Sequence, residues 1–158
     1  MAFEMDSDAW TRRLATLWQD SIPLATAMQV EIRRLDAQQL QLAAPPGPNR
    51  NHMGSAFGGS LQGLATLAGW GATLVATGDA ERYRVVVRDA HMRFDTPVFG
   101  ELVAEAGMPA AAAITAFRDA LASRGRARLT VTVEIRGAGD TPAARFAGEF
   151  VALESSGG

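Results

Sequence analysis

The sequence predicts an α+β fold in which an antiparallel sheet of about six strands wraps around one buried central helix. Residues 53–78 carry no charged side chain, so a helix formed there has no face suited to water. Several other segments alternate apolar and polar residues, as strands with one buried face do. Helical and strand-like segments do not alternate regularly along the chain, which favours an antiparallel sheet over a parallel one.

Composition limits the possible chemistry. The chain has 158 residues, 47% of them hydrophobic, which fits a single domain over residues 1–158 with its own core. The net charge of −2 argues against a nucleic-acid partner. All 15 basic residues are arginine, so a Schiff-base lysine and a Walker A lysine are excluded. Cysteine is absent, which excludes disulfides, thiolate zinc sites and a cysteine nucleophile.

The uncharged stretch could also suggest a membrane-spanning helix. Glycines and the polar residues Ser60, Gln62 and Thr66 interrupt the run, whereas a membrane span needs about 20 predominantly apolar residues. The first eight residues are acidic, unlike a signal peptide. We therefore expect a cytoplasmic protein without a membrane partner.

The first elements are predicted to be a helix and a hairpin. Asp6 or Ser7 can cap an amphipathic helix, which Pro23 ends. Its apolar residues fall at i, i+4, i+7 and i+8 and favour packing over a ligand clamp: Trp10, Leu14, Leu17 and Trp18. Residues 28–35 and 39–44 alternate and predict a hairpin. The first of these strands places Met28, Val30 and Ile32 on one face, and the second turns Leu40 and Leu42 inward.

A long strand is predicted over residues 82–95, after the central helix. Its alternation is imperfect, because three consecutive valines place bulk on both faces. Continuous pleating puts Asp89, His91 and Arg93 on one face, but a single bulge would change which set faces inward.

The remaining elements follow from cleaner patterns. A strand passes through Leu102, Ala104 and Ala106, and helical spacing over residues 108–123 ends at Gly125. Strict alternation over residues 126–137 predicts a strand with one face on the core. Residues 137–142 form a turn, and a last strand covers residues 143–153.

Two motifs resemble those of a known family. Residues 48–61, Pro-Asn-Arg-Asn-His-Met-Gly-Ser-Ala-Phe-Gly-Gly-Ser-Leu, followed by residues 67–71, Leu-Ala-Gly-Trp-Gly, resemble the YiiD C-terminal family of putative thioesterases in the hotdog superfamily. Residues 93–101 and 125–129 look like two later strands of that fold. The resemblance implies a hotdog fold and a dimer with active sites at the subunit interface.

The start of the central helix offers donors for thioester hydrolysis. The first N–H groups of a helix lack intrahelical partners and lie at the positive end of its dipole, so they can stabilise a developing oxyanion. Gly58, Gly59 and Ser60 begin the helix, and glycine lets a carbonyl approach the backbone. The alternative is that these glycines serve only close packing.

The residue that directs water is less obvious. Many hotdog thioesterases have His before the Gly-Gly pair and an acid on the helix, but Phe57 stands there and residues 53–78 contain no acid. Asn51, Asn49 and His52 are the nearest polar replacements, although turn formation would also explain them. Asp89, on the same face as His91, is a second catalytic candidate. With Gly59 as oxyanion donor, the predicted substrate-binding residues are Phe57, Gly58, Ser60 and Arg93.

These observations predict an acyl-CoA or acyl-carrier-protein thioesterase without a metal or cofactor. The alternative is a non-catalytic acyl-thioester-binding or scaffold domain on the same fold, which the missing acid favours. A hotdog dehydratase is a weaker enzyme alternative. We also expect a homodimer or higher homo-oligomer, because edge pairing of two curved sheets removes exposed strand edges.

Overall fold

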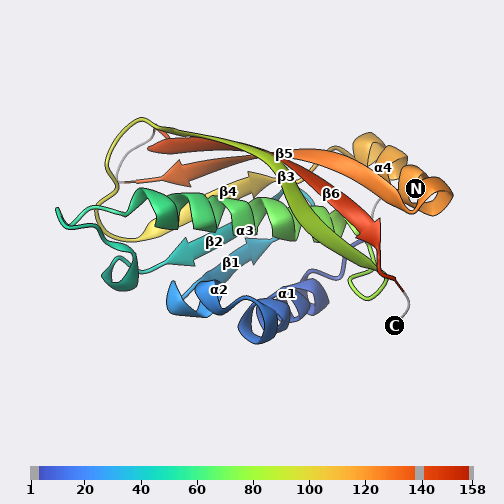
Figure 1. Cartoon of the computed structure of the whole chain (residues 1–158), viewed down its shortest axis with the longest axis horizontal. Coiled ribbons are helices and arrows are strands. Elements are labelled where there is room, and N and C mark those ends of the chain that lie inside the picture. Colours follow the sequence, from blue (N-terminus) through green and yellow to red (C-terminus); the bar gives the residue numbers. More distant parts are fainter. Residues whose placement is uncertain (1–3, 138–140, 157–158) are drawn as a thin grey trace.

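A computed structural model describes residues 4–137 and 141–156. Its helix α3 is held by a curved sheet (Figure 1). The six strands are in the order β1-β2-β4-β5-β6-β3, and every neighbouring pair is antiparallel. The α+β prediction with six strands around a central helix is therefore confirmed. In chain order the elements are α1 Ser7–Ser21, α2 Pro23–Ala27, β1 Glu31–Leu35, β2 Gln39–Ala44, the 3-10 helix η1 Gly47–Asn49, α3 Gly58–Thr77, β3 Tyr83–Phe94, β4 Leu102–Gly107, α4 Ala111–Arg124, β5 Arg126–Arg136 and β6 Ala144–Glu154.

The core lies between α3 and the concave face of the sheet. On β5 the alternation predicted from the sequence is observed, with buried residues at every second position from Ala127 to Ile135. Gly69 of α3 lets the sheet come close: a Cβ built there would lie 2.5 Å from Phe150 Cε2. The small residues of the uncharged stretch therefore do allow close helix-to-sheet packing. Of the turn predicted over residues 137–142, residues 138–140 lie outside the described part of the chain.

The N-terminal region differs from the prediction after the first helix. Asp6 caps α1 as expected, with its side chain accepting a hydrogen bond from Ala9 N at 2.9 Å. Pro23 does not end the helical structure but begins α2, because proline is tolerated at the first position of a helix. Met28 caps α2 and Gln29 has φ 58°. As a result, β1 begins only at Glu31, three residues later than predicted.

A bulge at Arg88 divides β3 into two halves. Val87 pairs with Phe150 and Asp89 pairs with Glu149, so Arg88 is the extra residue. The bulge turns Asp89 to the convex face of the sheet, whereas Val87 faces α3. The possibility of a bulge, left open by the sequence, is thus realised.

Helix α3 is buried at most positions, but the expectation of a helix wrapped on all sides is too strong. Its C-terminal half is enclosed, and α4 covers its end, where Arg118 Nε donates to Ala76 O at 2.8 Å. Burial lowers the pKa of the Arg118 guanidinium. On the N-terminal half Gly59 and Gln62 are exposed, so one side of α3 remains open.

Candidate active site

The first turn of α3 presents two unused backbone donors. Phe57 occupies the N-cap position and provides no side-chain cap. Its carbonyl accepts hydrogen bonds from Ser60 N at 2.9 Å and Leu61 N at 3.1 Å. Within the described part of the chain, the N–H groups of Gly58 and Gly59 have no acceptor. Together with the helix dipole, these two donors form a site suited to a partial negative charge.

The ring of Phe57 lies over Gly59. A Cβ built on Gly59 would be 2.5 Å from Phe57 Cε1, and Phe57 itself is 57% exposed. On the other side, a Cβ built on Gly58 would be 3.6 Å from Phe94 Cε1, in a hollow of about 330 Å³. The two glycines therefore leave the helix start accessible between two aromatic rings.

An apolar groove runs from Gly59 along the open side of α3. We call it the α3 groove; its volume is about 340 Å³. One wall comes from the α1–α2 junction and the other from Val87 of β3, and Trp70 lies at its far end, where its Nε1 donates to Val85 O at 2.8 Å. Its lining residues are Ile22, Leu24, Gly59, Gln62, Gly63, Thr66, Leu67, Trp70 and Val87.

The two asparagines predicted as catalytic hold the loop before α3 in shape. Asn49 is 1% exposed, and its Nδ2 donates to Met28 O at 2.9 Å and Pro45 O at 2.8 Å. Asn51 Oδ1 accepts from Met53 N at 2.8 Å and Ser55 N at 3.2 Å, while its Nδ2 donates to Ser55 Oγ at 2.9 Å. The Asn51 side chain is thus engaged within the loop, and the Asn49 amide nitrogen ties the loop to the end of α2, whereas Asn49 Oδ1 is buried with no hydrogen-bond partner among the described residues.

The other polar candidates lie apart from the α3 groove. His52 is exposed in the same loop and forms no hydrogen bond within the described residues. Asp89 and Arg93 are exposed on the convex face of β3, opposite α3. Arg93 Nε donates to Asp95 Oδ1 at 2.8 Å. The structure thus brings Phe57, Gly58, Gly59 and Ser60 together and leaves the strand residues elsewhere.

Two polar residues of the α3 groove were not selected from the sequence. Gln62 and Thr66 follow Gly59 at i+3 and i+7 and so share its side of the helix. Thr66 Oγ1 donates to Gln62 O at 2.8 Å, and the exposed Gln62 amide has no partner among the described side chains. Helical spacing from Gly59 was the signal that could have identified them.

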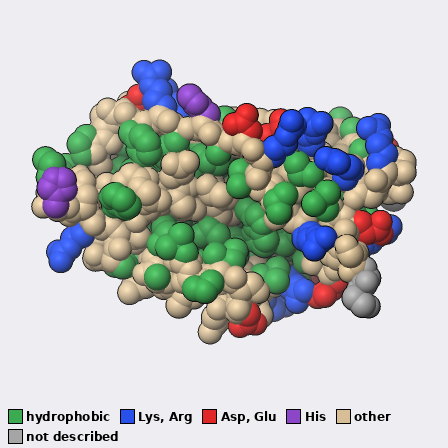
Figure 2. All heavy atoms as spheres, viewed as in Figure 1, with side chains coloured by type: hydrophobic (Ala, Val, Ile, Leu, Met, Phe, Trp, Pro, Cys, Tyr) green, Lys and Arg blue, Asp and Glu red, His purple; other side chains and the backbone are tan. Residues whose placement is uncertain are grey.

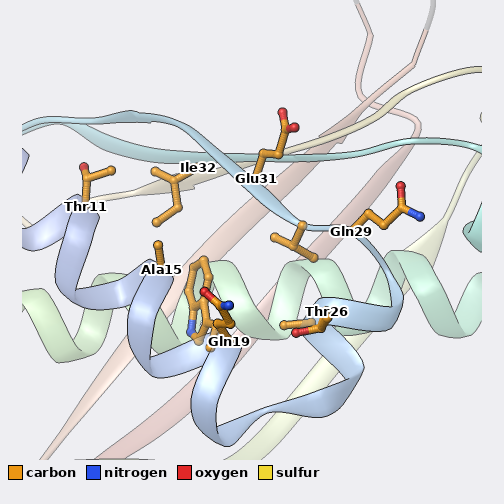
Figure 3. A pocket seen from close by; sticks show the side chains of 10 residues that line it. Thr11, Ala15, Gln19, Thr26, Gln29, Glu31 and Ile32 are labelled. Atoms are coloured by element: carbon orange, nitrogen blue, oxygen red, sulfur yellow. The ribbon is translucent and has the colours of Figure 1, made fainter.

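A separate hollow of about 540 Å³ lies between α1, α2 and β1 (Figure 3). Its polar lining consists of Thr11, Gln19, Thr26, Gln29 and Glu31. Figure 3 shows the Glu31 carboxylate turned away from this hollow. Among the described residues that line this hollow, no side-chain base lies beside unused backbone N–H donors. We therefore place the candidate site at the start of α3.

Among the described residues, no group of three or more His, Cys, Asp or Glu side chains is arranged to hold a metal ion. None of their helices combines the length and apolar character that a membrane crossing requires.

Comparison with known proteins places the chain among thioesterase-like structures. The model of the family described as "Putative thioesterase (yiiD_Cterm)" matches residues 11–154. A protein of unknown function from Chlorobaculum tepidum TLS is 28% identical, with a TM-score of 0.90 over 94% of this chain and 97% of that one. A "putative thioesterase" from Shewanella oneidensis is 26% identical, with a TM-score of 0.81 over 92% of this chain and 99% of that one. A Haemophilus influenzae thioesterase that is 17% identical, with a TM-score of 0.69 over 91% and 90%, shares the fold. The hotdog fold predicted from the sequence is confirmed.

Proposed function

This chain belongs to the family described as "Putative thioesterase (yiiD_Cterm)", and from that premise we propose that it hydrolyses acyl thioesters of coenzyme A or of an acyl-carrier protein. One observation carries the proposal: the uncapped start of α3, with the N–H groups of Gly58 and Gly59 unused, opens at one end of the apolar α3 groove. A groove of this kind suits an acyl chain, and the donors suit its carbonyl oxygen.

The proposed reaction uses this geometry. Water attacks the carbonyl carbon, and the oxygen that becomes negative is stabilised by the N–H groups of Gly58 and Gly59. Collapse of the tetrahedral intermediate breaks the C–S bond, and the proton given up by the attacking water ends on the departing sulfur, so that the products are the carboxylic acid and the thiol. Phe57 shields the mouth of the α3 groove, with Ser60 in the same turn.

Gln62 and Thr66 are the groups that we propose to orient the attacking water. They are polar side chains of the α3 groove, and no carboxylate is among the described residues that line it. An amide and a hydroxyl can position water by hydrogen bonds but are too weak to deprotonate it. Asn51 contributes by fixing the loop that leads into the helix.

A second candidate function is binding of an acyl thioester without turnover. It is favoured by the same absence of a carboxylate from the lining of the α3 groove. The two functions differ in one respect, since a binding domain would hold an acyl-CoA in the groove and leave it intact.

We further propose that the chain acts as a homodimer that pairs through β3. This strand is at the end of the sheet, with β6 on one side only. Val86 and Val87 are 47% and 44% exposed. Figure 2 shows apolar side chains gathered over the middle of the face on which α3 is seen in Figure 1. Pairing there would cover an edge that otherwise favours aggregation, and Val87 also lines the α3 groove.

Sedimentation at micromolar concentration should show a dimer, and Val86→Arg should shift it to a monomer.

A panel of acyl-CoA and acyl-carrier-protein substrates, followed by release of free thiol, tests the proposed activity. The protein itself contributes no thiol because it contains no cysteine. Turnover on at least one substrate is expected, and Gln62→Leu should lower kcat with little change in stability, since Gln62 is exposed. Tight binding of acyl-CoA with no thiol released from any substrate would instead support the binding domain.

A further inference from the structure

A hollow of about 580 Å³ lies between α4 and the first half of β5. We call it the arginine hollow; it is lined by Ala113, Ala116, Phe117, Ala120, Arg124, Arg126, Ala127, Arg128 and Leu129. Figure 1 shows α4 at the opposite end of α3 from the loop that leads into that helix. Because α3 has 20 residues, about 30 Å of helix separates the two ends. The arginine hollow is therefore distinct from the candidate active site.

The hollow exists because β4 is shorter than β5. The β4–β5 ladder runs from Val103 opposite Arg136 to Ala106 opposite Val133. Pro109 follows β4 without an N–H to continue the ladder, and the chain turns into α4. The N-terminal half of β5 is consequently paired with β6 alone, within the described residues.

Alternate residues of this half of β5 direct their backbone toward α4. Glu154 N donates to Gly125 O at 2.8 Å, and β5 then pairs with β6 in an unbroken antiparallel register. In such a ladder, hydrogen-bonded and non-hydrogen-bonded pairs alternate. The N–H and C=O groups of Arg126, Arg128 and Thr130 therefore point away from β6, and no backbone partner for them is found among the described residues. This is an unpaired strand edge.

The edge is also positively charged. Arg124 and Arg126 have no carboxylate partner within the described chain. Arg128 is 3.5 Å from Glu149, which Arg88 contacts more closely at 2.8 Å. Among the described residues no acidic side chain lines the hollow, and its α4 wall presents alanines, whose small side chains leave room for another backbone.

We propose that the arginine hollow binds an acidic, extended segment of a partner protein, which adds to β5 as a further strand. The unpaired edge supplies alternating backbone donors and acceptors for such a segment. The arginines supply charge complementarity to its Asp or Glu side chains. A small anion would use the arginines but not the strand edge.

The test uses a fluorescein-labelled, blocked octapeptide of alternating Glu and Val, with binding followed by fluorescence anisotropy. Saturable binding to the wild-type protein is expected, and it should weaken as salt is added. Arg126→Glu should lower the affinity at least about tenfold, because it replaces a charge-assisted contact with a repulsive one.

Arg145→Glu is the matched control. Arg145 is also an exposed strand arginine without a carboxylate partner among the described residues, but it is absent from the lining of the arginine hollow. This variant should bind the peptide within about twofold of the wild type. Ala116→Leu, which fills the hollow from the exposed side of α4, should abolish binding without reversing any charge.

Three further outcomes would overturn the proposal. A peptide with the same sequence, N-methylated at the residues that face β5, keeps its charge but cannot form the ladder. Equal binding of this peptide would contradict strand addition. Tripolyphosphate that binds tightly where the octapeptide does not would show a small-anion site, and absence of octapeptide binding to the wild type would likewise refute the proposal.

Discussion

Replacing Gly59 by alanine should reduce activity without reducing stability. The added Cβ would lie 2.5 Å from Phe57 Cε1, whereas ordinary contact begins at 3.4 Å, so the ring must move by at least 0.9 Å. Phe57 is 57% exposed and can move at little energetic cost. Alanine also has a higher helix propensity than glycine, by up to about 1 kcal/mol. The free energy of unfolding should therefore stay the same or rise slightly.

The effect on turnover should be much larger than the effect on stability. The new methyl group is added to the residue that supplies one of the two proposed donors, and it displaces the Phe57 ring that packs against that residue. We expect both changes to hinder the approach of the substrate carbonyl to Gly58 and Gly59. Loss of one oxyanion donor typically lowers kcat by about 10²- to 10³-fold. We expect a fall of that order for Gly59→Ala, measured by thiol release from a short-chain acyl-CoA on which the wild type turns over.

Gly63→Ala provides the matched control for this prediction. Gly63 also lines the α3 groove, one turn further along, and a Cβ built there lies 3.4 Å from Met28 Sδ, an ordinary contact. The same methyl group is thus added to the same helix without approaching the oxyanion donors. Turnover of a short-chain substrate should remain near the wild-type value. If Gly59→Ala stays within twofold of the wild type, the start of α3 is not the oxyanion site.

Three other predictions each concern a single residue. Gly69→Ala should destabilise the fold by about 1–3 kcal/mol in urea unfolding, because its Cβ would lie 2.5 Å from the fully buried Phe150 ring; an unchanged midpoint would contradict this packing. The hydrogen bond from Gln38 N lowers the pKa of the Asp36 carboxyl below its ordinary value. The ionised carboxylate therefore stabilises the fold above that ordinary value, and this stabilisation is lost as the pH falls through the lowered pKa. The free energies of unfolding of the wild type and Asp36→Asn should accordingly converge in acid. His52 is exposed and has no orienting hydrogen bond among the described residues, so His52→Gln should keep the wild-type kcat, and a large fall in kcat at unchanged stability would instead identify it as the base.

The parts of the fold that could be predicted are those where one pattern decides. On β5 strict alternation fixes the buried face, and at the end of α4 Gly125 adopts φ 70°, as a C-terminal glycine is expected to do. Pro23 was ambiguous, because proline both stops one helix and begins another. The bulge at Arg88 could not be located from the sequence, since three consecutive valines fit either face of β3.

The site was predictable to the extent that it depends on the backbone. Gly58 and Gly59 begin α3 as the sequence indicated. The role of Asn51 could not be read from composition, because whether an amide turns toward its own loop or toward a substrate depends on the loop conformation. Gln62 and Thr66 escape prediction for another reason: a helix expected to be enclosed has no open side on which to place them.

A missing cap does not by itself identify a functional helix start. Helix α4 also begins without a side-chain cap, at Ala110, whereas α1 has a cap from Asp6. What distinguishes α3 is the combination of two glycines whose N–H groups are unused, at a point where the helix emerges at the end of an apolar groove. A side chain in place of a Cα hydrogen of either glycine would raise the helix propensity but obstruct the approach to the N–H donors. At the start of α3 the sequence therefore gives up local stability where we propose that a carbonyl oxygen binds.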